Sequence, residues 1–259
     1  MFLALESRTV TKLLHKRAFF MSKLPYKRIL LKLSGEALMG KQKFGIESNA
    51  CRKIAIEVQE LCRLGVSVGI VIGGGNIFRG ANVAQGGIER TPADHIGMLA
   101  TLINGIALQQ AFEQIQCESR IMSAISCDVM AEPYSWKNAL KYLDKGIVLI
   151  FVGGTGNPYF TTDSAAALRA LEIQAEILMK ATKVDGIYNK DPLKYPDAVK
   201  YERVSYSEVL ANDLQVMDPT AIALCRENKT PILVFNVFVE DALKKAVYKE
   251  PVGTLVERG

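Results

Sequence analysis

The chain has 259 residues, of which 49% are hydrophobic and 23% are charged, and its formal net charge is +5. This apolar content excludes an intrinsically disordered chain, and no apolar run approaches the roughly 18 residues that a membrane-spanning helix needs. Residues 1–20 hold four basic side chains and one acidic side chain, so the rest of the chain holds 28 basic and 26 acidic ones. This near balance suits a phosphate-bearing ligand but does not require nucleic acid as a partner.

The cysteines and histidines limit the metal and redox chemistry. Five cysteines are widely spaced without a Cys-x-x-Cys pair, and the chain has only two histidines. A disulfide framework and a zinc site are therefore not expected, and free thiols in a reducing cytoplasm fit best. Basic residues interrupt the apolar ones in residues 1–20, unlike a secretory signal. A transit-like peptide, a dispensable extension and a start of translation at Met21 instead of Met1 all stay open.

From Ile29 onward, apolar runs typical of strands alternate with segments typical of helices. We expect strands at residues 29–33, 66–72, 119–125, 147–152, 175–179 and 232–235. We expect helices at residues 49–64, 92–116, 135–143, 163–171 and 220–227. This alternation predicts an α/β fold, a mostly parallel open sheet with helices on both faces, and residues 21–259 are expected to form one domain.

Three glycine-rich loops follow three of the expected strands. They are Lys-Leu-Ser-Gly-Glu at 32–36, Gly-Gly-Gly-Asn at 73–76 followed by Arg79, and Gly-Gly-Thr-Gly-Asn-Pro at 153–158. Glycines let backbone N–H groups approach an anion, and ligands of parallel sheets bind where the strands end. One such loop alone could be an ordinary turn, but three of them, with Lys32 and Arg79 beside two, predict a polyphosphate site.

Two familiar nucleotide-binding motifs are excluded. Residues 35–41 begin like a Walker A loop, but Gln42 stands where a Ser or Thr would bind magnesium, and the residues between the glycines favour a helix. No Gly-x-Gly-x-x-Gly with a following acidic residue occurs, so the sequence lacks the main motif that would indicate a dinucleotide-dependent oxidoreductase.

Five ordered motifs, read together, resemble the amino-acid kinase family, in particular its bacterial members that phosphorylate UMP. The matching segments are residues 26–38, 71–80, 94–101, 154–163 and 180–186, and the similarity extends from about Tyr26 to the C-terminus. The resemblance implies a three-layer α/β sandwich and transfer of a phosphoryl group from ATP to UMP in pyrimidine nucleotide synthesis. It also implies Mg²⁺ carried mainly by the ATP phosphates, with no metal ligands from the protein, and a homo-oligomer, commonly a hexamer.

The resemblance also implies roles for individual residues. The implied catalytic residues are Lys32, Arg79 and Asp163. The implied ATP-binding residues are Lys32, Leu33, Ser34, Gly35, Gly75, Arg79, Thr182, Tyr188 and Asp191. The implied UMP-binding residues are Gly74, Asp94, Thr155, Gly156, Asn157, Pro158, Tyr159, Phe160, Thr161 and Thr162. Gly40, Lys41, Gln42, Lys43, Phe44 and Gly45 correspond to a segment implicated in regulation by GTP.

Helix capping is an alternative role for some of the acidic residues. Thr91 followed by Pro92 is a good helix start, so Asp94 could serve in helix capping instead of contacting the UMP ribose. Asp163 could likewise cap a helix, and Asp218 is read as an N-cap only.

Two competing functions also stay open. One is a related kinase acting on a carboxylate or carbamate, and the other is a nucleotide-sensing regulator that binds DNA.

Overall fold

The computed structural model describes residues 24–78, 87–192, 194–214 and 216–259. The strands are β1 (Arg28–Leu33), β2 (Ser67–Ile72), β3 (Ser119–Ser123), β4 (Glu132–Pro133), β5 (Val148–Val152), β6 (Ile177–Thr182), β7 (Ile187–Tyr188), β8 (Lys200–Tyr201), β9 (Arg203–Ser205), β10 (Ile232–Asn236) and β11 (Thr254–Glu257). The helices are η1 (Gly35–Leu38), α2 (Ser48–Leu64), α4 (Arg90–Gln114), α5 (Trp136–Asp144), α6 (Thr162–Glu172), α7 (Tyr206–Ala211), α8 (Pro219–Glu227) and α9 (Ala242–Val247).

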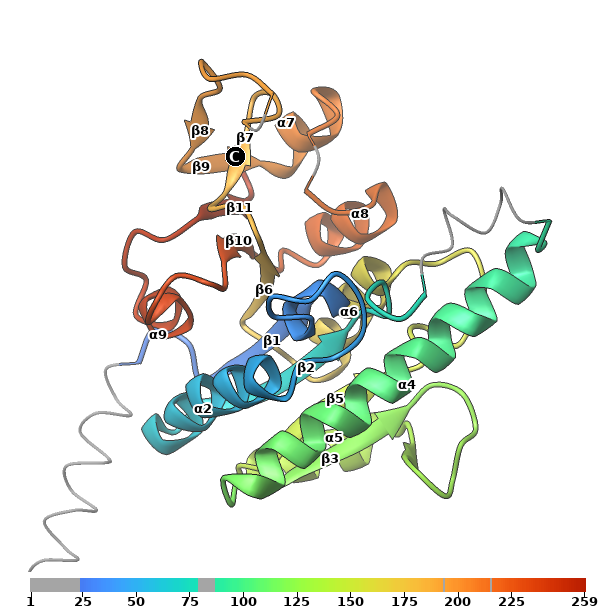
Figure 1. The fold of residues 1–259 in the computed structure, drawn as a ribbon. Helices are drawn as coiled ribbons and strands as arrows, with labels where there is room; N and C mark the ends of the chain where they lie inside the picture. The colour runs from blue at the N-terminus through green and yellow to red at the C-terminus, as the bar shows by residue number, and fades with distance from the viewer. Residues whose placement is uncertain (1–23, 79–86, 193, 215) are drawn as a thin grey trace, which may run out of the picture.

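Nine of the strands form one sheet in the order β4-β3-β5-β2-β1-β6-β10-β11-β9. Its neighbouring strands run parallel except β10 and β11, and β7 and β8 form a separate antiparallel pair (Figure 1). The predicted fold class is therefore confirmed. Strand β1 lies near the middle of the sheet, so the loop that follows it has a neighbouring loop on each side.

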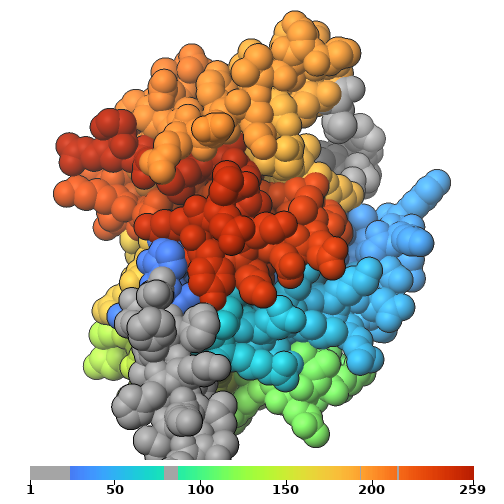
Figure 2. All heavy atoms as spheres, turned by 90° about the vertical axis from the view of Figure 1, so that its left-hand side faces the viewer, coloured from blue at the N-terminus to red at the C-terminus, as the bar shows by residue number. Residues whose placement is uncertain are grey.

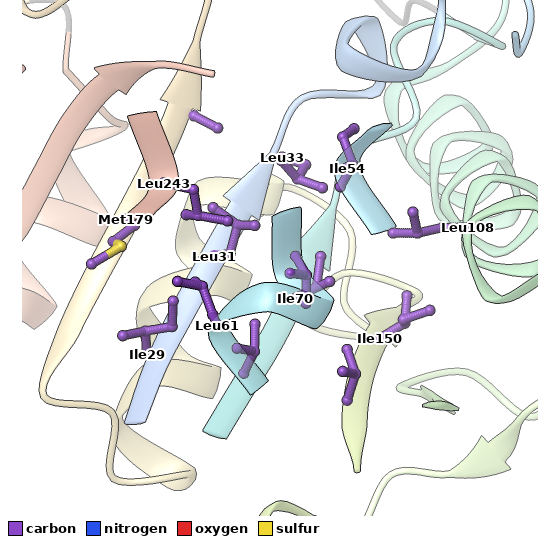
Figure 3. Close-up of a cluster of buried hydrophobic side chains, with 14 of the residues drawn as sticks. Ile29, Leu31, Leu33, Ile54, Leu61, Ile70, Leu108, Ile150, Met179 and Leu243 are labelled. Carbon is purple, nitrogen blue, oxygen red and sulfur yellow. The ribbon is translucent and has the colours of Figure 1, made fainter. Parts of the chain in front are cut away.

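Helices cover both faces of the sheet because the central strands are apolar on both faces. Ile29, Leu31 and Leu33 of β1 join the core beneath α2, α4 and α9, as the close-up in Figure 3 shows for part of this cluster. Leu30, which points the opposite way, joins the core beneath α5, α6 and α8. In the space-filling view of Figure 2, the red C-terminal part of the chain lies against the blue and cyan part that contains α2.

The predicted elements are present, but some of their boundaries differ. The strand expected at residues 175–179 is β6, which starts at Ile177 and continues to Thr182 because it pairs with β1 and β10 over that length. Short elements in the C-terminal part, namely β7, β8, β9, β11, α7 and α9, have no counterpart among the predicted elements. Among the described helices, none combines the length and the apolar composition that a membrane span requires.

Candidate active site

Two lysines on adjacent central strands form the centre of the site. Lys32 of β1 and Lys180 of β6 are direct partners in the strand register. Each lies two residues after a leucine of the α6-side core, Leu30 or Leu178, so both side chains point to the face that α6 covers. Asp163, the second residue of α6, contacts both lysines: its Oδ1 lies 2.8 Å from Lys32 Nζ, and its Oδ2 lies 2.8 Å from Lys180 Nζ.

The charges of this Lys–Asp–Lys cluster depend on one another. Like charges directly opposite each other in a sheet repel, and the Asp163 carboxylate offsets this repulsion. Burial raises the pKa of Asp163, but the adjacent charges of Lys32 and Lys180 more than offset burial and hold it below its ordinary value. Burial lowers the pKa of Lys180, and Asp163 counteracts this only in part. The cluster has one positive charge in excess and is suited to an anionic ligand.

The second glycine-rich loop packs against α4. A Cβ on Gly74 would lie only 2.8 Å from Ala100 Cβ and 2.9 Å from the Gly97 carbonyl oxygen, so this close approach requires glycine. A Cβ on Gly75 would meet no atom within 4 Å, so packing does not explain the glycine there. Open space beside the Gly75 backbone is what close approach of a phosphate needs.

A buried pair of amides fixes the end of this loop. Asn76 and Asn104 of α4 donate to each other's side-chain oxygens at 2.9 and 2.7 Å, and Asn104 also donates to the Gly73 carbonyl oxygen at 2.7 Å. The Asn76 side chain also donates to the Gly45 carbonyl oxygen at 2.9 Å, and the Asn76 backbone carbonyl oxygen accepts from the Gly45 N–H at 3.0 Å. Asn76 therefore links the glycine-rich loop to the segment at residues 40–45, whose residues 40–44 are exposed.

The third glycine-rich loop leads into α6, and its polar side chains fix the start of that helix. Thr161 is the N-cap and accepts from the Asp163 N–H at 3.0 Å, so the alternative in which Asp163 itself caps the helix is wrong. Asp218 does cap α8, accepting from the Ala221 N–H at 2.9 Å. The same carboxylate also accepts from the hydroxyl and N–H of Ser164, so it joins the starts of α6 and α8.

Two pockets lie on either side of the start of α6. The smaller, about 160 Å³, is lined by Gly74, Gly75, Phe78, Ala93, Asp94, Gly97, Met98, Thr101, Gly154, Thr155, Phe160, Thr161 and Thr162. The larger, about 450 Å³, is lined by Asp163, Lys180, Val209, Leu210, Asp213, Leu214, Val216, Met217, Asp218, Pro219 and Ile222. Because the consecutive residues Thr162 and Asp163 line different pockets, two ligands could meet at the Lys–Asp–Lys cluster. Here the small pocket is called the loop pocket and the large one the α8 pocket.

Six residues predicted to bind UMP, namely Gly74, Asp94, Thr155, Phe160, Thr161 and Thr162, line the loop pocket. Gly156, Asn157, Pro158 and Tyr159 belong to the same loop but are not among the lining residues. The helix start expected at Thr91 is wrong: α4 begins at Arg90, with Glu89 as its N-cap. Asp94 is therefore the fifth residue of α4, beyond the first turn where capping acts, and its carboxylate accepts from Arg90 and from the Tyr159 N–H instead.

The residues predicted to bind ATP do not all lie around one pocket. Within the described ranges, Thr182, Tyr188 and Asp191 line neither pocket. The Thr182 hydroxyl donates to the Val184 carbonyl oxygen at 2.6 Å, and the Tyr188 hydroxyl donates to Asp185 at 2.6 Å. The side chain of Leu33 is fully buried in the core, while Ser34 and Gly35 follow β1 beside Lys32. Arg79 lies outside the described residues.

Lys180 and Asp218 were not predicted as site residues. A signal for Lys180 exists in the sequence, because an isolated lysine follows the apolar run Ile-Leu-Met at 177–179, just as Lys32 follows an apolar run. What the pattern cannot show is that β6 lies next to β1. Among the described residues, no group of three or more His, Cys, Asp or Glu side chains could hold a metal ion.

The fold and this lysine–carboxylate site define an α/β protein suited to phosphate-bearing ligands. The family model described as "Amino acid kinase family" matches residues 27–236, so the chain belongs to the amino acid kinase family. It is 61% identical to a uridylate kinase of Protochlamydia amoebophila over 92% of this chain and 96% of that protein. It is 53% identical to a uridylate kinase of Legionella pneumophila over 90% of this chain and 95% of that protein. The crystal structure of UMP kinase from Bacillus anthracis superimposes with a TM-score of 0.87 at 39% identity, covering 90% of this chain and 96% of that one.

Proposed function

We propose that this protein is a UMP kinase, which transfers the γ-phosphoryl group of ATP reversibly to UMP and so forms UDP and ADP. The observation that carries the proposal is the Lys–Asp–Lys cluster between two pockets, supported by the uridylate kinases to which the chain is similar. We assign UMP to the loop pocket, where Asp94 can accept from ribose hydroxyls, and ATP to the side of the α8 pocket.

The chemistry needs little from a general base. A UMP phosphate has a second pKa of about 6 and is already largely dianionic at neutral pH. The protein must instead bring two anions together and stabilise the charge on the transferred phosphoryl group. Lys32 and Lys180 are placed to do this, with Asp163 fixing the direction of both ammonium groups. We assign the N–H groups of Ser34 and Gly35 as further donors for phosphate oxygens, and Arg79 is proposed as another phosphate ligand.

Magnesium is the metal we propose for this reaction. Both carboxylate oxygens of Asp163 contact lysines, so this side chain is poorly suited to bind the ion directly. A Mg²⁺ ion held by ATP phosphates and water fits this donor set, and it would neutralise phosphate charge when bound. The protein's own contribution is the two lysines and the backbone N–H groups.

The direct test is UDP formation by the purified chain with ATP, Mg²⁺ and UMP, followed by chromatography of the nucleotides. Lys32→Ala should lose activity by at least about a hundredfold, as expected for loss of a group that stabilises the transferred phosphoryl charge. Acetylglutamate, aspartate and carbamate serve as competing acceptors, and preference for any of them over UMP would refute the proposal. Salt-dependent DNA binding by a chain without UMP activity would favour the regulator instead.

The surface of α4 supports a homo-oligomer, and we propose a hexamer. Leu99, Ile103 and Ile106 follow one another at helical spacing and are 50%, 48% and 40% exposed. An apolar stripe of this kind on a long helix suits burial against a second copy. Ile103→Asp should reduce the mass found by light scattering, whereas a monomeric wild type would refute the assembly.

We also propose a cytoplasmic location and a single catalytic domain over residues 21–259. All five cysteines are free, as a reducing compartment would keep them. Residues 1–20 lie outside both the family match and the described residues, and we assign them no catalytic role. Regulation by GTP through residues 40–45 stays a prediction, and UDP formation with and without GTP tests it.

A further inference from the structure

The Asp94 carboxylate, which lines the loop pocket, is held by two donors from different parts of the chain. Arg90 Nε, one helical turn earlier in α4, donates to Asp94 Oδ2 at 2.7 Å. The Tyr159 N–H, in the third glycine-rich loop, donates to the same oxygen at 2.7 Å. Among the described residues, both of these donors bond to Oδ2 and neither bonds to Oδ1, which is the oxygen that we assign to a ligand.

The two donors also contact each other. The Arg90 guanidinium lies 5.3 Å from the centroid of the Tyr159 ring, within the range of a cation–π interaction. Tyr159 has φ 73°, a left-handed conformation that an aromatic residue rarely adopts. The hydrogen bond to Asp94 and the contact with Arg90 therefore hold an unfavourable backbone conformation at the edge of the loop pocket.

We propose that Arg90 is a positioning residue for acceptor binding, acting through Asp94 and Tyr159. Its side chain is about half exposed and does not line the loop pocket, so it is placed to orient Asp94 rather than to contact the acceptor. By holding Oδ2, Arg90 fixes the plane of the Asp94 carboxylate, and we assign Oδ1 of the same group to accept from a ribose hydroxyl. The inference rests on the proposed function, because the acceptor is taken to be UMP.

Arg90→Ala is the main test, and Arg52→Ala is its control. Arg52 is an exposed arginine on α2 for which the described residues provide no ion pair. We expect Arg90→Ala to raise the KM for UMP about fivefold, the size expected for loss of a partly exposed ion pair, with little change in kcat or in the KM for ATP. Discrimination between UMP and 2′-deoxy-UMP should fall as well, because ribose contacts weaken.

A double-mutant cycle separates positioning from direct contact. If Arg90 acts through Asp94, Arg90→Ala should have little further effect on the KM for UMP in an Asp94→Asn background. Arg90→Gln, a second variant with a long polar side chain, should raise the KM less than Arg90→Ala, and melting curves of both should match that of Arg52→Ala.

The outcomes separate this inference from the proposed function. A wild type that forms no UDP refutes the proposed function. An active wild type refutes the role of Arg90 if the KM for UMP in Arg90→Ala is unchanged or lower, if the KM for ATP rises equally, or if the two substitutions have additive effects.

Discussion

Replacing Asp163 by Asn is the sharpest test of the Lys–Asp–Lys cluster. Each lysine Nζ lies 2.8 Å from a carboxylate oxygen, and the three side chains are only 10–17% exposed. At an effective dielectric constant of about 20, charges at that separation attract by roughly 6 kcal/mol, which partly offsets the hydration that each ion loses. Breaking such a buried arrangement by removing one partner costs about 3–5 kcal/mol, so Asp163→Asn should lower the Tm by roughly 6–20 °C.

The loss of stability in Asp163→Asn should depend on pH and on the presence of anions. Because Asp163 raises the pKa of Lys180, the substitution lowers that pKa further below its ordinary value of about 10.4. The unfolded chain then binds more protons than the folded one, so the variant should recover stability as the pH rises toward 10. ATP without Mg²⁺ should raise the Tm of the variant more than that of the wild type, because two lysines then lack a carboxylate.

The assay is thermal unfolding by circular dichroism at pH 7 and pH 9, with and without ATP. Asp144→Asn is the matched control, since this carboxylate is 66% exposed and forms one ion pair of 2.7 Å with Arg28. The control should change the free energy of unfolding by less than about 1 kcal/mol. If Asp163→Asn melts together with the control, the carboxylate does not neutralise the lysines and our reasoning about the cluster is wrong.

Three further predictions concern other parts of the chain. Asn104→Ala should cost about 2–3 kcal/mol in urea unfolding, because it removes the buried amide that donates both to the Gly73 carbonyl oxygen and to the Asn76 side-chain oxygen; a loss below about 0.5 kcal/mol, on the order of a surface change, would contradict this. Burial and the nearby Asp241 raise the pKa of Glu57 to about 7, so the folded state binds the extra proton and stability falls as the pH rises from about 5 to 8. Glu57→Gln should remove roughly 1–2 kcal/mol of that fall in urea titrations at the two pH values, and an equal fall in both proteins would refute it. A chain starting at Met21 should keep the KM for UMP and the kcat of the full chain, and a loss above about tenfold, or 1.4 kcal/mol, would assign residues 1–20 a role.

The central strands could be predicted from the sequence because burial on both faces of the sheet requires a run of apolar residues. A strand covered on both faces is mostly apolar, and β1, β2 and β5 are largely apolar runs next to glycine-rich turns. The loops that follow them therefore marked the edge of the sheet where the candidate site lies. Their gathering around Lys32 follows from strand order, which no local pattern encodes.

Two of the differences between prediction and structure depend on contacts between distant segments, and one, at the start of α4, is local. Lys180 has little meaning as a site residue until β6 is known to pair with β1. The signature at Thr91 is that of a capped helix start, yet α4 begins at Arg90 and its N-cap side chain forms no capping bond. Asp218 was recognised as a cap, but its bonds to Ser164 require α6 and α8 to meet. Residues that serve two elements at once are the ones that sequence reasoning places least well.

Because Lys32 and Lys180 are paired in the strand register, the spacing of the sheet fixes the distance between their backbones. Hydrogen-bonded strands lie about 4.8 Å apart, and the ladder between β1 and β6 holds that spacing along five paired residues. A single residue inserted before Lys180 within β6 would turn its side chain to the α2 side, and no rotamer could bring it back. The number of residues in β1 and β6 therefore matters more to the site than which apolar residues they contain. These strands should accept many apolar exchanges and no insertion or deletion.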